Sequence, residues 1–219
     1  MRLLIVEDDP ELGQFLVRAM RAEGDVVDHV MTGEDGLSWP NPASIDLIIL
    51  DKHLPDMDAL AFIKAWRSSG LSTPILVLSA DGDCDGKVNC LNAGADDYVL
   101  KPFRTPELIA RCRVLNRRQG MSLKASVLEA GDLKVDTDNR RVELQGLEVI
   151  LSAFEYRLLE FLMRRNGRPA SKSEIIDVLY PSGEEPQENA IEAHVSRLRR
   201  KIGTDRIISR RGIGYALVA

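Results

Sequence analysis

Five short apolar runs alternate with longer amphipathic segments through the first half of the chain. The runs lie at residues 3–6, 26–30, 46–50, 74–79 and 98–100. Strands that are apolar throughout are buried on both faces, and their alternation with helical segments is typical of a parallel sheet covered by helices. The pattern therefore predicts an α/β fold with a doubly wound, five-stranded parallel sheet.

A different pattern follows residue 118. Residues 119–127 are interpreted as a linker between a first domain, residues 1–118, and a second domain, residues 128–219. The second domain begins with short strand-like pieces between polar turns and ends in a predicted β-hairpin. Between these, apolar residues recur at helical spacing in three segments, residues 152–167, 171–180 and 187–203.

Polar residues follow four of the predicted strands at the point where each strand ends. Glu7 and Asp8 follow the first strand, Asp51 the third, Ser79 the fourth and Lys101 the fifth. The carboxyl ends of parallel strands meet at one edge of the sheet, so these side chains are expected to lie together. Acidic residues that merely cap helices would not explain why Asp51 and Lys101 end apolar runs at the same edge.

This set of side chains predicts a site for a phosphoryl group. Three carboxylates held together need a cation, and oxygen ligands favour Mg²⁺ or Mn²⁺. The metal and Lys101 would offset the charge of the phosphoryl oxygens, and Ser79 would donate a hydrogen bond to them. Asp51 is then the nucleophile that becomes an aspartyl phosphate.

Over residues 1–118 the chain resembles the receiver domain of bacterial response regulators, which has a flavodoxin-like or CheY-like fold. The motifs that carry the resemblance are IVEDD, LIILDKHLPDMDA, ILVLSA and GADDYVLKPF. The resemblance implies four ligands for Mg²⁺, namely Glu7, Asp8, Asp51 and the backbone carbonyl of His53. It also implies that a sensor histidine kinase phosphorylates Asp51, that Tyr98 swings inward on activation, and that the Lys101–Pro102 peptide bond is cis.

The chain departs from the receiver pattern at three positions. Ala59 stands where glycine is common, so it must adopt a conformation that glycine adopts more easily. His53 and Asp81 stand two residues after Asp51 and Ser79. In the family these two positions flank the water that attacks the phosphate, so they bear on the lifetime of the phosphate.

The stretch DGDCDG, residues 81–86, is similar to the front half of a calcium-binding EF-hand loop. Position twelve of such a loop would be Asn92, where the motif needs a bidentate glutamate. In a receiver domain the same residues fill the loop before the fourth helix, with Lys87 as the basic residue that follows. We therefore expect a mobile acidic loop rather than a calcium site.

Charge is divided unequally along the chain, whose net charge is −5. Acidic residues outnumber basic ones in the first 120 residues, whereas basic residues predominate between Gln187 and Tyr215. This asymmetry indicates two domains with different partners.

The predicted helix NAIEAHVSRLRRKI has two contrasting faces. Its narrow apolar stripe consists of Ile191, Val195, Leu198 and Ile202. The opposite face carries small and cationic residues, namely Ala190, Ala193, Arg197, Arg200 and Lys201. A basic face with small residues fits the major groove of DNA, although the solvated face of an ordinary surface helix would have the same pattern.

The surrounding segments favour DNA binding, because another helix precedes this one and a hairpin with the motif SRRGIGY follows it. Over residues 128–219 the chain closely resembles the winged-helix effector domain of OmpR/PhoB-type regulators, on the motifs LSAFEYRLLEFLMRRNGRPASK, HVSRLRRKIG and RRGIGY. The resemblance implies that Arg197 contacts bases and that Arg210 or Arg211 reaches the minor groove. It implies phosphate contacts from Arg199, Arg200, Lys172 and Arg211. Ala190 stands where the family often has threonine.

Receivers of the OmpR/PhoB type dimerise through their fourth helix, fifth strand and fifth helix. Three charge pairs are expected across that interface: Lys87 with Glu107, Asp97 with Arg111, and Asp96 with Arg118. Phosphorylation of Asp51 would favour the dimer. Its two effector domains would then bind direct repeats about one DNA turn apart.

The sequence thus predicts a DNA-binding transcriptional regulator of a two-component system. Its expected partners are a sensor histidine kinase, promoter DNA, a second copy of itself and, as a further candidate, RNA polymerase. The receiver would catalyse only its own phosphorylation and dephosphorylation, so we do not expect an enzyme acting on other substrates.

Two alternatives are kept beside this prediction. A magnesium-dependent phosphohydrolase could use the same edge of the sheet, but enzymes of that kind need an acid where this chain has His53. A DNA-binding regulator with a vestigial receiver would not respond to phosphorylation. The intact acidic residues, together with Ser79 and Lys101, count against it.

Nothing in the sequence predicts a membrane segment or a disulfide framework. No apolar run approaches about 18 residues, and MRLLIVEDD becomes acidic too early for a signal peptide, so we expect a cytoplasmic protein without a membrane partner. Cys84, Cys90 and Cys112 lack CxxC spacing and are expected to be buried or half-buried free thiols.

Overall fold

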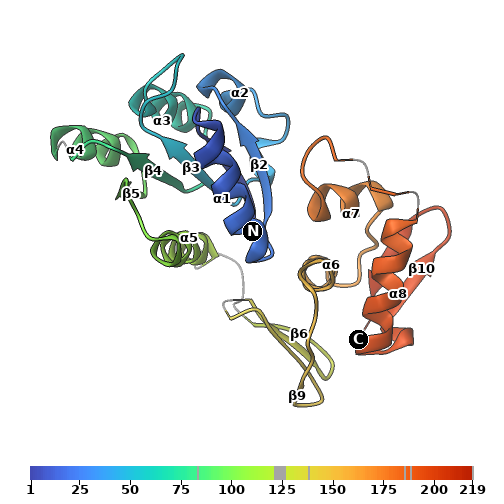
Figure 1. Cartoon of the computed structure of the whole chain (residues 1–219). Coiled ribbons are helices and arrows are strands. Elements are labelled where there is room, and N and C mark those ends of the chain that lie inside the picture. Colours follow the sequence, from blue (N-terminus) through green and yellow to red (C-terminus); the bar gives the residue numbers. More distant parts are fainter. Residues whose placement is uncertain (83, 121–126, 138, 185, 188, 219) are drawn as a thin grey trace. The chain divides into compact units, whose positions relative to one another are not determined.

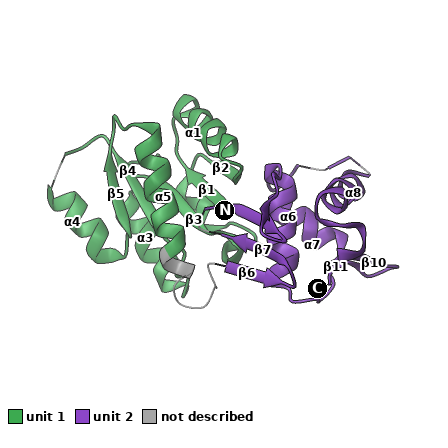
Figure 2. Cartoon of the chain, turned by 90° about the horizontal axis from the view of Figure 1, so that it is seen from below, with its two compact units in different colours: residues 1–122 green, residues 123–219 purple. Residues whose placement is uncertain are grey.

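The computed structural model describes residues 1–82, 84–120, 127–137, 139–184, 186–187 and 189–218, without the side chains of residues 118–120. The chain forms two compact units, residues 1–122 and 123–219, which are coloured green and purple in Figure 2. Most of the linker expected at residues 119–127 lies outside the described residues. Each unit has its own sheets and its own hydrophobic core.

The first unit alternates strands with helices along the chain (Figure 1). Its strands are β1 (Arg2–Val6), β2 (Val26–Val30), β3 (Leu47–Asp51), β4 (Ile75–Ser79) and β5 (Asp97–Leu100). Its helices are α1 (Pro10–Ala22), α2 (Gly33–Leu37), α3 (Ala59–Ser68), α4 (Cys84–Ala93) and α5 (Thr105–Gly120), with a 3₁₀ turn at Pro42–Ser44.

The five strands form a parallel sheet in the order β2-β1-β3-β4-β5. Leu3 and Ile5 face a core shared with α1 and α5, whereas Leu4 and Val6 face a core shared with α3 and α4. Alternate strand residues thus bury opposite faces of the sheet, as the apolar runs require. The predicted doubly wound fold is confirmed. The strand order reverses between β1 and β3, which leaves a crevice at their carboxyl ends.

Helix α4 begins at Cys84, inside the stretch DGDCDG. The prediction of an acidic loop through residue 86 is wrong in its extent, because residues 84–86 are already helical. Asp85 lies in the first turn, where a carboxylate stabilises a helix by interacting with its dipole. Cys84 is exposed, contrary to the expectation for the thiols, whereas Cys90 and Cys112 are buried.

The second unit begins with an antiparallel sheet in the order β6-β7-β8-β9. Its strands are β6 (Val127–Ala130), β7 (Leu133–Asp136), β8 (Arg141–Leu144) and β9 (Leu147–Glu148). Helices α6 (Ala153–Arg164), α7 (Lys172–Leu179) and α8 (Ala190–Ile202) follow. A 3₁₀ turn (Thr204–Arg206) then leads into a hairpin of β10 (Ile207–Arg210) and β11 (Gly214–Leu217). Strand β6 was not predicted, since its first residue fell within the expected linker.

The three helices and the hairpin share one core. Helix α8 buries Ile191, Val195, Leu198 and Ile202, which is the stripe that the sequence predicted. Capping boxes at Ser152 and at Ser171 start α6 and α7. The winged-helix arrangement of the second unit is thereby confirmed.

Candidate functional site

Three carboxylates converge at the carboxyl edge of the parallel sheet. Glu7 and Asp8 directly follow β1, and Asp51 is the last residue of β3. One carboxylate oxygen from each of the three residues lies within 4.8 Å of the other two. Glu7 and Asp51 are buried, and Asp8 is exposed. An oxygen-only set of this composition suits a hard divalent cation such as Mg²⁺.

The ammonium group of Lys101 joins the two buried carboxylates. Its Nζ donates hydrogen bonds to Oδ1 of Asp51 at 2.5 Å and to Oε2 of Glu7 at 2.8 Å. Burial alone would lower the pKa of Lys101, but the hydrogen bonds that it donates to Asp51 and Glu7 outweigh burial, and the pKa is raised. Burial raises the pKa of Glu7, although the hydrogen bond that it accepts from Lys101 opposes this shift. The charged lysine therefore offsets part of the repulsion between the acids. The Lys101–Pro102 peptide bond is cis, as predicted.

Ser79 and the two residues that depart from the receiver pattern lie at the ends of β3 and β4. Ser79 is fully buried, and its Oγ accepts a hydrogen bond from the backbone N–H of Asp81 at 3.0 Å. His53 Nε2 donates to Oδ2 of Asp81 at 2.7 Å, and Lys52 Nζ lies 3.2 Å from the same oxygen. These contacts, that of His53 first, hold the pKa of Asp81 below its usual value. His53 and Asp81 are thus paired with each other.

Tyr98 lies inside the first unit, with 5% of its surface exposed. Its ring faces the ammonium group of Lys87, 5.8 Å from the ring centroid. The hydroxyl of Tyr98 has no hydrogen-bond partner among the residues that the structure describes.

In the second unit, the outward face of α8 carries Arg197 and Arg200, both exposed. The guanidinium group of Arg197 donates to Nδ1 of His194 at 3.0 Å. Arg210 and Arg211 are exposed at the turn between β10 and β11. Exposed cations on one helix face and on a neighbouring hairpin are the arrangement with which proteins contact phosphates and base edges.

The other basic residues proposed for DNA contact make contacts within the second unit. Arg199 donates to the carbonyl oxygen of Ile207 at 2.5 and 2.8 Å and to Oγ of Ser209 at 2.9 Å. Lys201 pairs with the buried Glu155 at 2.7 Å, and Lys172 pairs with Glu192. These three side chains must leave or share intradomain contacts before they can reach DNA.

Comparison with known proteins matches both units. Residues 3–113 match the family described as response regulator receiver domain, and residues 146–217 match the family described as transcriptional regulatory protein, C terminal. The two-component response regulator PhoP of Pseudomonas aeruginosa is 42% identical over 219 residues, 98% of this chain and 97% of that protein. The chain belongs to the OmpR/PhoB family of response regulators.

Further relatives agree with this assignment. The transcriptional regulatory protein CusR of Escherichia coli K12 is 38% identical over 221 residues, 99% of this chain and 97% of CusR. The solved structure of a Francisella response regulator receiver domain has a TM-score of 0.51 at 30% identity and covers 54% of this chain and 98% of its own. This OmpR/PhoB regulator therefore combines a receiver domain with a winged-helix, DNA-binding domain that regulates transcription. Among the described residues, no helix is long and apolar enough to cross a membrane.

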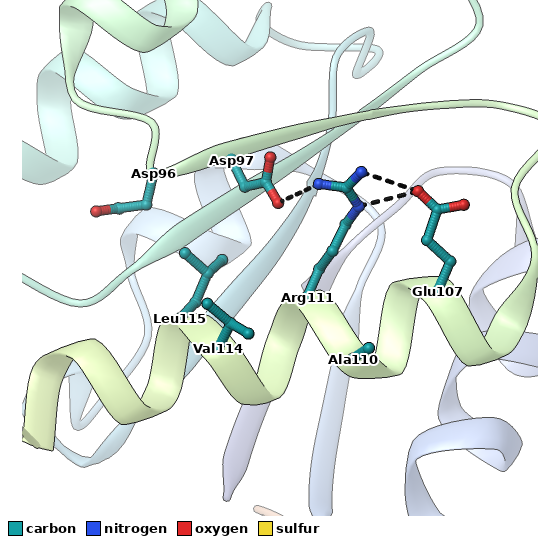
Figure 3. Close-up of a pocket in the computed structure, with 7 residues that line it drawn as sticks. All are labelled: Asp96, Asp97, Glu107, Ala110, Arg111, Val114 and Leu115. Carbon is teal, nitrogen blue, oxygen red and sulfur yellow. Dashed lines mark hydrogen bonds and ion pairs between the residues drawn. The ribbon is translucent and has the colours of Figure 1, made fainter.

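The charged residues expected at a dimer interface lie on α4, on α5 and around β5 of the regulator. Arg111 donates to Asp97 at 3.0 Å and to Glu107 at 2.9 Å within the same chain (Figure 3). Asp96 accepts hydrogen bonds from Arg67 and from a backbone N–H, both at 2.9 Å. The side chain of Arg118 lies outside the described residues. A hollow of about 420 Å³ on this face is lined by Asp96, Asp97, Glu107, Ala110, Arg111, Val114 and Leu115.

Sequence reasoning missed the structural role of Arg199 and Lys201, although a signal was present. At about 100° per residue, Arg199 lies on one flank of the buried stripe of α8, and Lys201, which was assigned above to the opposite face, lies on the other flank; Arg197 and Arg200 lie opposite the stripe. Basic residues on a flank can reach neighbouring elements of the same domain. Sequence reasoning also missed Lys52, which directly follows Asp51 and joins Asp81.

Proposed function

We propose that Asp51 accepts a phosphoryl group from a sensor histidine kinase while Glu7, Asp8 and Asp51 hold Mg²⁺. The observation that carries the proposal is the cluster of three carboxylates within 4.8 Å, with the ammonium group of Lys101 2.5 Å from Asp51. The donor set fits the metal, because all three groups are oxygen ligands and Asp8 is exposed. The backbone carbonyl of His53 is a further proposed ligand.

In the proposed reaction, a carboxylate oxygen of Asp51 attacks the phosphorus of a phosphohistidine on the kinase. The new O–P bond forms as the N–P bond breaks, and the histidine leaves with the electron pair. Lys101 and the hydroxyl of Ser79 would bind the phosphoryl oxygens. Bound Mg²⁺ would supply positive charge to the same oxygens. Because the product is the modified chain itself, we propose no catalysis on other substrates.

Phosphorylation would act through the dimer. The pairs that Arg111 now makes with Asp97 and Glu107 lie at an exposed face, so they can be exchanged between two copies at little cost. A dimer would place two copies of α8 in successive major grooves, with Arg197 and Arg200 toward the DNA and Arg210 or Arg211 toward the minor groove. RNA polymerase is a further proposed partner, and the cytoplasm is the proposed site of action because promoter DNA lies there.

A small phosphodonor tests the chemistry without the kinase. Full-length protein is incubated with acetyl phosphate and Mg²⁺, and its intact mass is measured. We expect the wild type to gain one phosphoryl group, and we expect no gain when the metal is chelated or in the Asp51→Asn variant. Lys101→Ala is expected to slow the reaction, because a cation beside the transferred group is lost.

A wild type that gains no phosphoryl group would contradict the proposal. A gain that persists in Asp51→Asn would assign the acceptor to another residue. A gain of mass that persists without metal would show that phosphorylation does not depend on a metal held by Glu7 and Asp8.

A further inference from the structure

Three helices of the effector domain enclose one histidine beside Arg197. His194 from α8 stacks on Phe154 from α6, with ring centroids 4.8 Å apart and an angle of 6° between the planes. Its Nε2 lies 3.0 Å from the hydroxyl oxygen of Tyr180, which ends α7. Its Nδ1 lies 3.0 Å from Nη2 of Arg197. Both ring nitrogens are therefore engaged, and the ring is held on one face by an aromatic partner.

These partners determine which nitrogen carries the proton. An arginine side chain can only donate hydrogen bonds, so Nδ1 of His194 must accept and is unprotonated. In the neutral ring the proton then lies on Nε2, which donates to Tyr180. An imidazolium would carry protons on both nitrogens. It would turn an N–H toward the guanidinium group of Arg197, and that contact would be lost.

The charges around His194 favour the neutral ring. Burial and then the positive charges of Arg197 and Arg157 lower the pKa of His194 from its usual value of 6.5, while Glu155 opposes the shift. Arg157 and Glu155 belong to α6, and Arg157 also lies over the ring of Phe154, 4.7 Å from its centroid. At neutral pH the acceptor for Arg197 is therefore available.

We propose that His194 is a positioning residue that orients Arg197 for base recognition, through a hydrogen bond that only the neutral ring can accept. The inference rests on the proposed contact of Arg197 with DNA. An arginine distinguishes a base best when two of its N–H groups are presented in a fixed plane. With Nη2 held by His194, less rotamer freedom is lost on binding. Loss of this orientation is expected to reduce discrimination between DNA sequences more than it reduces overall affinity for DNA.

The test uses full-length protein and duplexes that the wild type selects from a random DNA pool. Binding to a selected duplex and to single base-pair variants of it is compared for wild type, Arg197→Ala, His194→Phe and His194→Gln. Arg197→Ala identifies the base pair at which this arginine discriminates. At that base pair His194→Phe, which keeps the ring stack on Phe154, is expected to lose roughly tenfold in discrimination. His194→Gln restores a neutral hydrogen-bond acceptor and is expected to recover part of the lost discrimination.

The pH profile separates positioning from a merely structural role. As the pH falls from neutral through the pKa of His194, which lies below 6.5, discrimination by the wild type is expected to fall, whereas the Gln variant stays flat. The inference is overturned if His194→Phe discriminates as well as wild type, or if acidification strengthens wild-type discrimination, as a direct contact of the imidazolium with a base edge would. If the wild type selects no sequence, the proposed DNA contact of Arg197 fails and the inference fails with it.

Discussion

At the scale of single residues, Gly214 leaves the least room for a side chain among the glycines of the described residues. It begins β11 with a φ of 140°, and a Cβ there would lie 1.8 Å from the carbonyl oxygen of Ala170. That carbonyl accepts the N–H of Tyr215 at 2.9 Å, and the N–H of Ala170 donates to Tyr215 at 2.7 Å. The close approach thus fastens the hairpin to the loop between α6 and α7.

We expect Gly214→Ala to destabilise the effector domain by more than about 3 kcal/mol, because backbone would have to move. Gly212→Ala is the matched control: Gly212 also has a positive φ, 73°, but, apart from its chain neighbours, no described residue has an atom within 4 Å of an added Cβ. We expect Gly212→Ala to lower the free energy of unfolding by about 1 kcal/mol. Urea unfolding of both variants measures the difference. Equal losses would show that the contact with Ala170 is not what demands glycine.

Single residues also show how much of the proposed phosphoryl site could be predicted from the sequence. Topology brings strand ends together, so Glu7, Asp8, Asp51 and Lys101 could be expected at one edge from the apolar runs alone. The pairing of His53 with Asp81 could not be predicted, because both residues lie in segments that follow strands. Local hydrogen bonds determine the path of such segments. One of them runs from the backbone N–H of His53 to Asp51, at 2.9 Å.

At the scale of elements, α8 contains two kinds of arginine, and their substitution should separate stability from binding. Arg199→Ala removes hydrogen bonds to β10 and is expected to lower the unfolding free energy by about 1–3 kcal/mol. Arg200→Ala removes an exposed cation. It is expected to leave stability within about 0.5 kcal/mol and to weaken binding to all DNA sequences while reducing the salt dependence. Thermal unfolding and salt titrations of DNA binding check the two predictions. A stability loss in Arg200→Ala without one in Arg199→Ala would contradict these roles.

The contact between α6 and α8 predicts a pH dependence. Burial would raise the pKa of Glu155, but the hydrogen bond from Lys201 and those at Ser152 outweigh it and hold the pKa below 4.5. A lowered folded-state pKa stabilises the domain above the unfolded value and ceases to do so as the pH falls through the folded value.

Glu155→Gln tests this contribution, because glutamine can keep the capping box but not the ion pair. We expect a loss of about 1 kcal/mol at neutral pH, modest because Lys201 is 39% exposed. The loss should shrink below about pH 4.5 in urea unfolding. A difference that is constant with pH would mean that the carboxylate charge does not stabilise the domain.

Helices and strands with a clear apolar pattern in their own sequence could be predicted. Those that form only through contacts with another segment could not. The stripe of α8 and the apolar runs of the first unit repeat over several residues and were read correctly. Strand β6 has only four residues, none of them fully buried, and it forms because it pairs with β7. The early start of α4 was hidden by the glycines of DGDCDG, which favour loops by themselves.

At the scale of the whole molecule, the acidic receiver and the basic face of α8 are expected to act through assembly. The face of α4, β5 and α5 leaves several large apolar side chains exposed, namely Val88, Leu91, Leu100 and Val114. Together with the charges of Asp97, Glu107 and Arg111, such a face can bury apolar surface in a dimer whose register is set by charge. We expect the phosphorylation state of Asp51 to control this assembly.

The most direct test is sedimentation equilibrium of the full-length chain with Mg²⁺, with and without beryllofluoride as a phosphoryl mimic. We predict that the wild type shifts from monomer toward dimer when beryllofluoride is added and that Asp51→Ala does not. If neither protein responds, or if both are dimers from the start, assembly is not controlled from Asp51. The chain would then regulate transcription through a differently triggered or constitutive form.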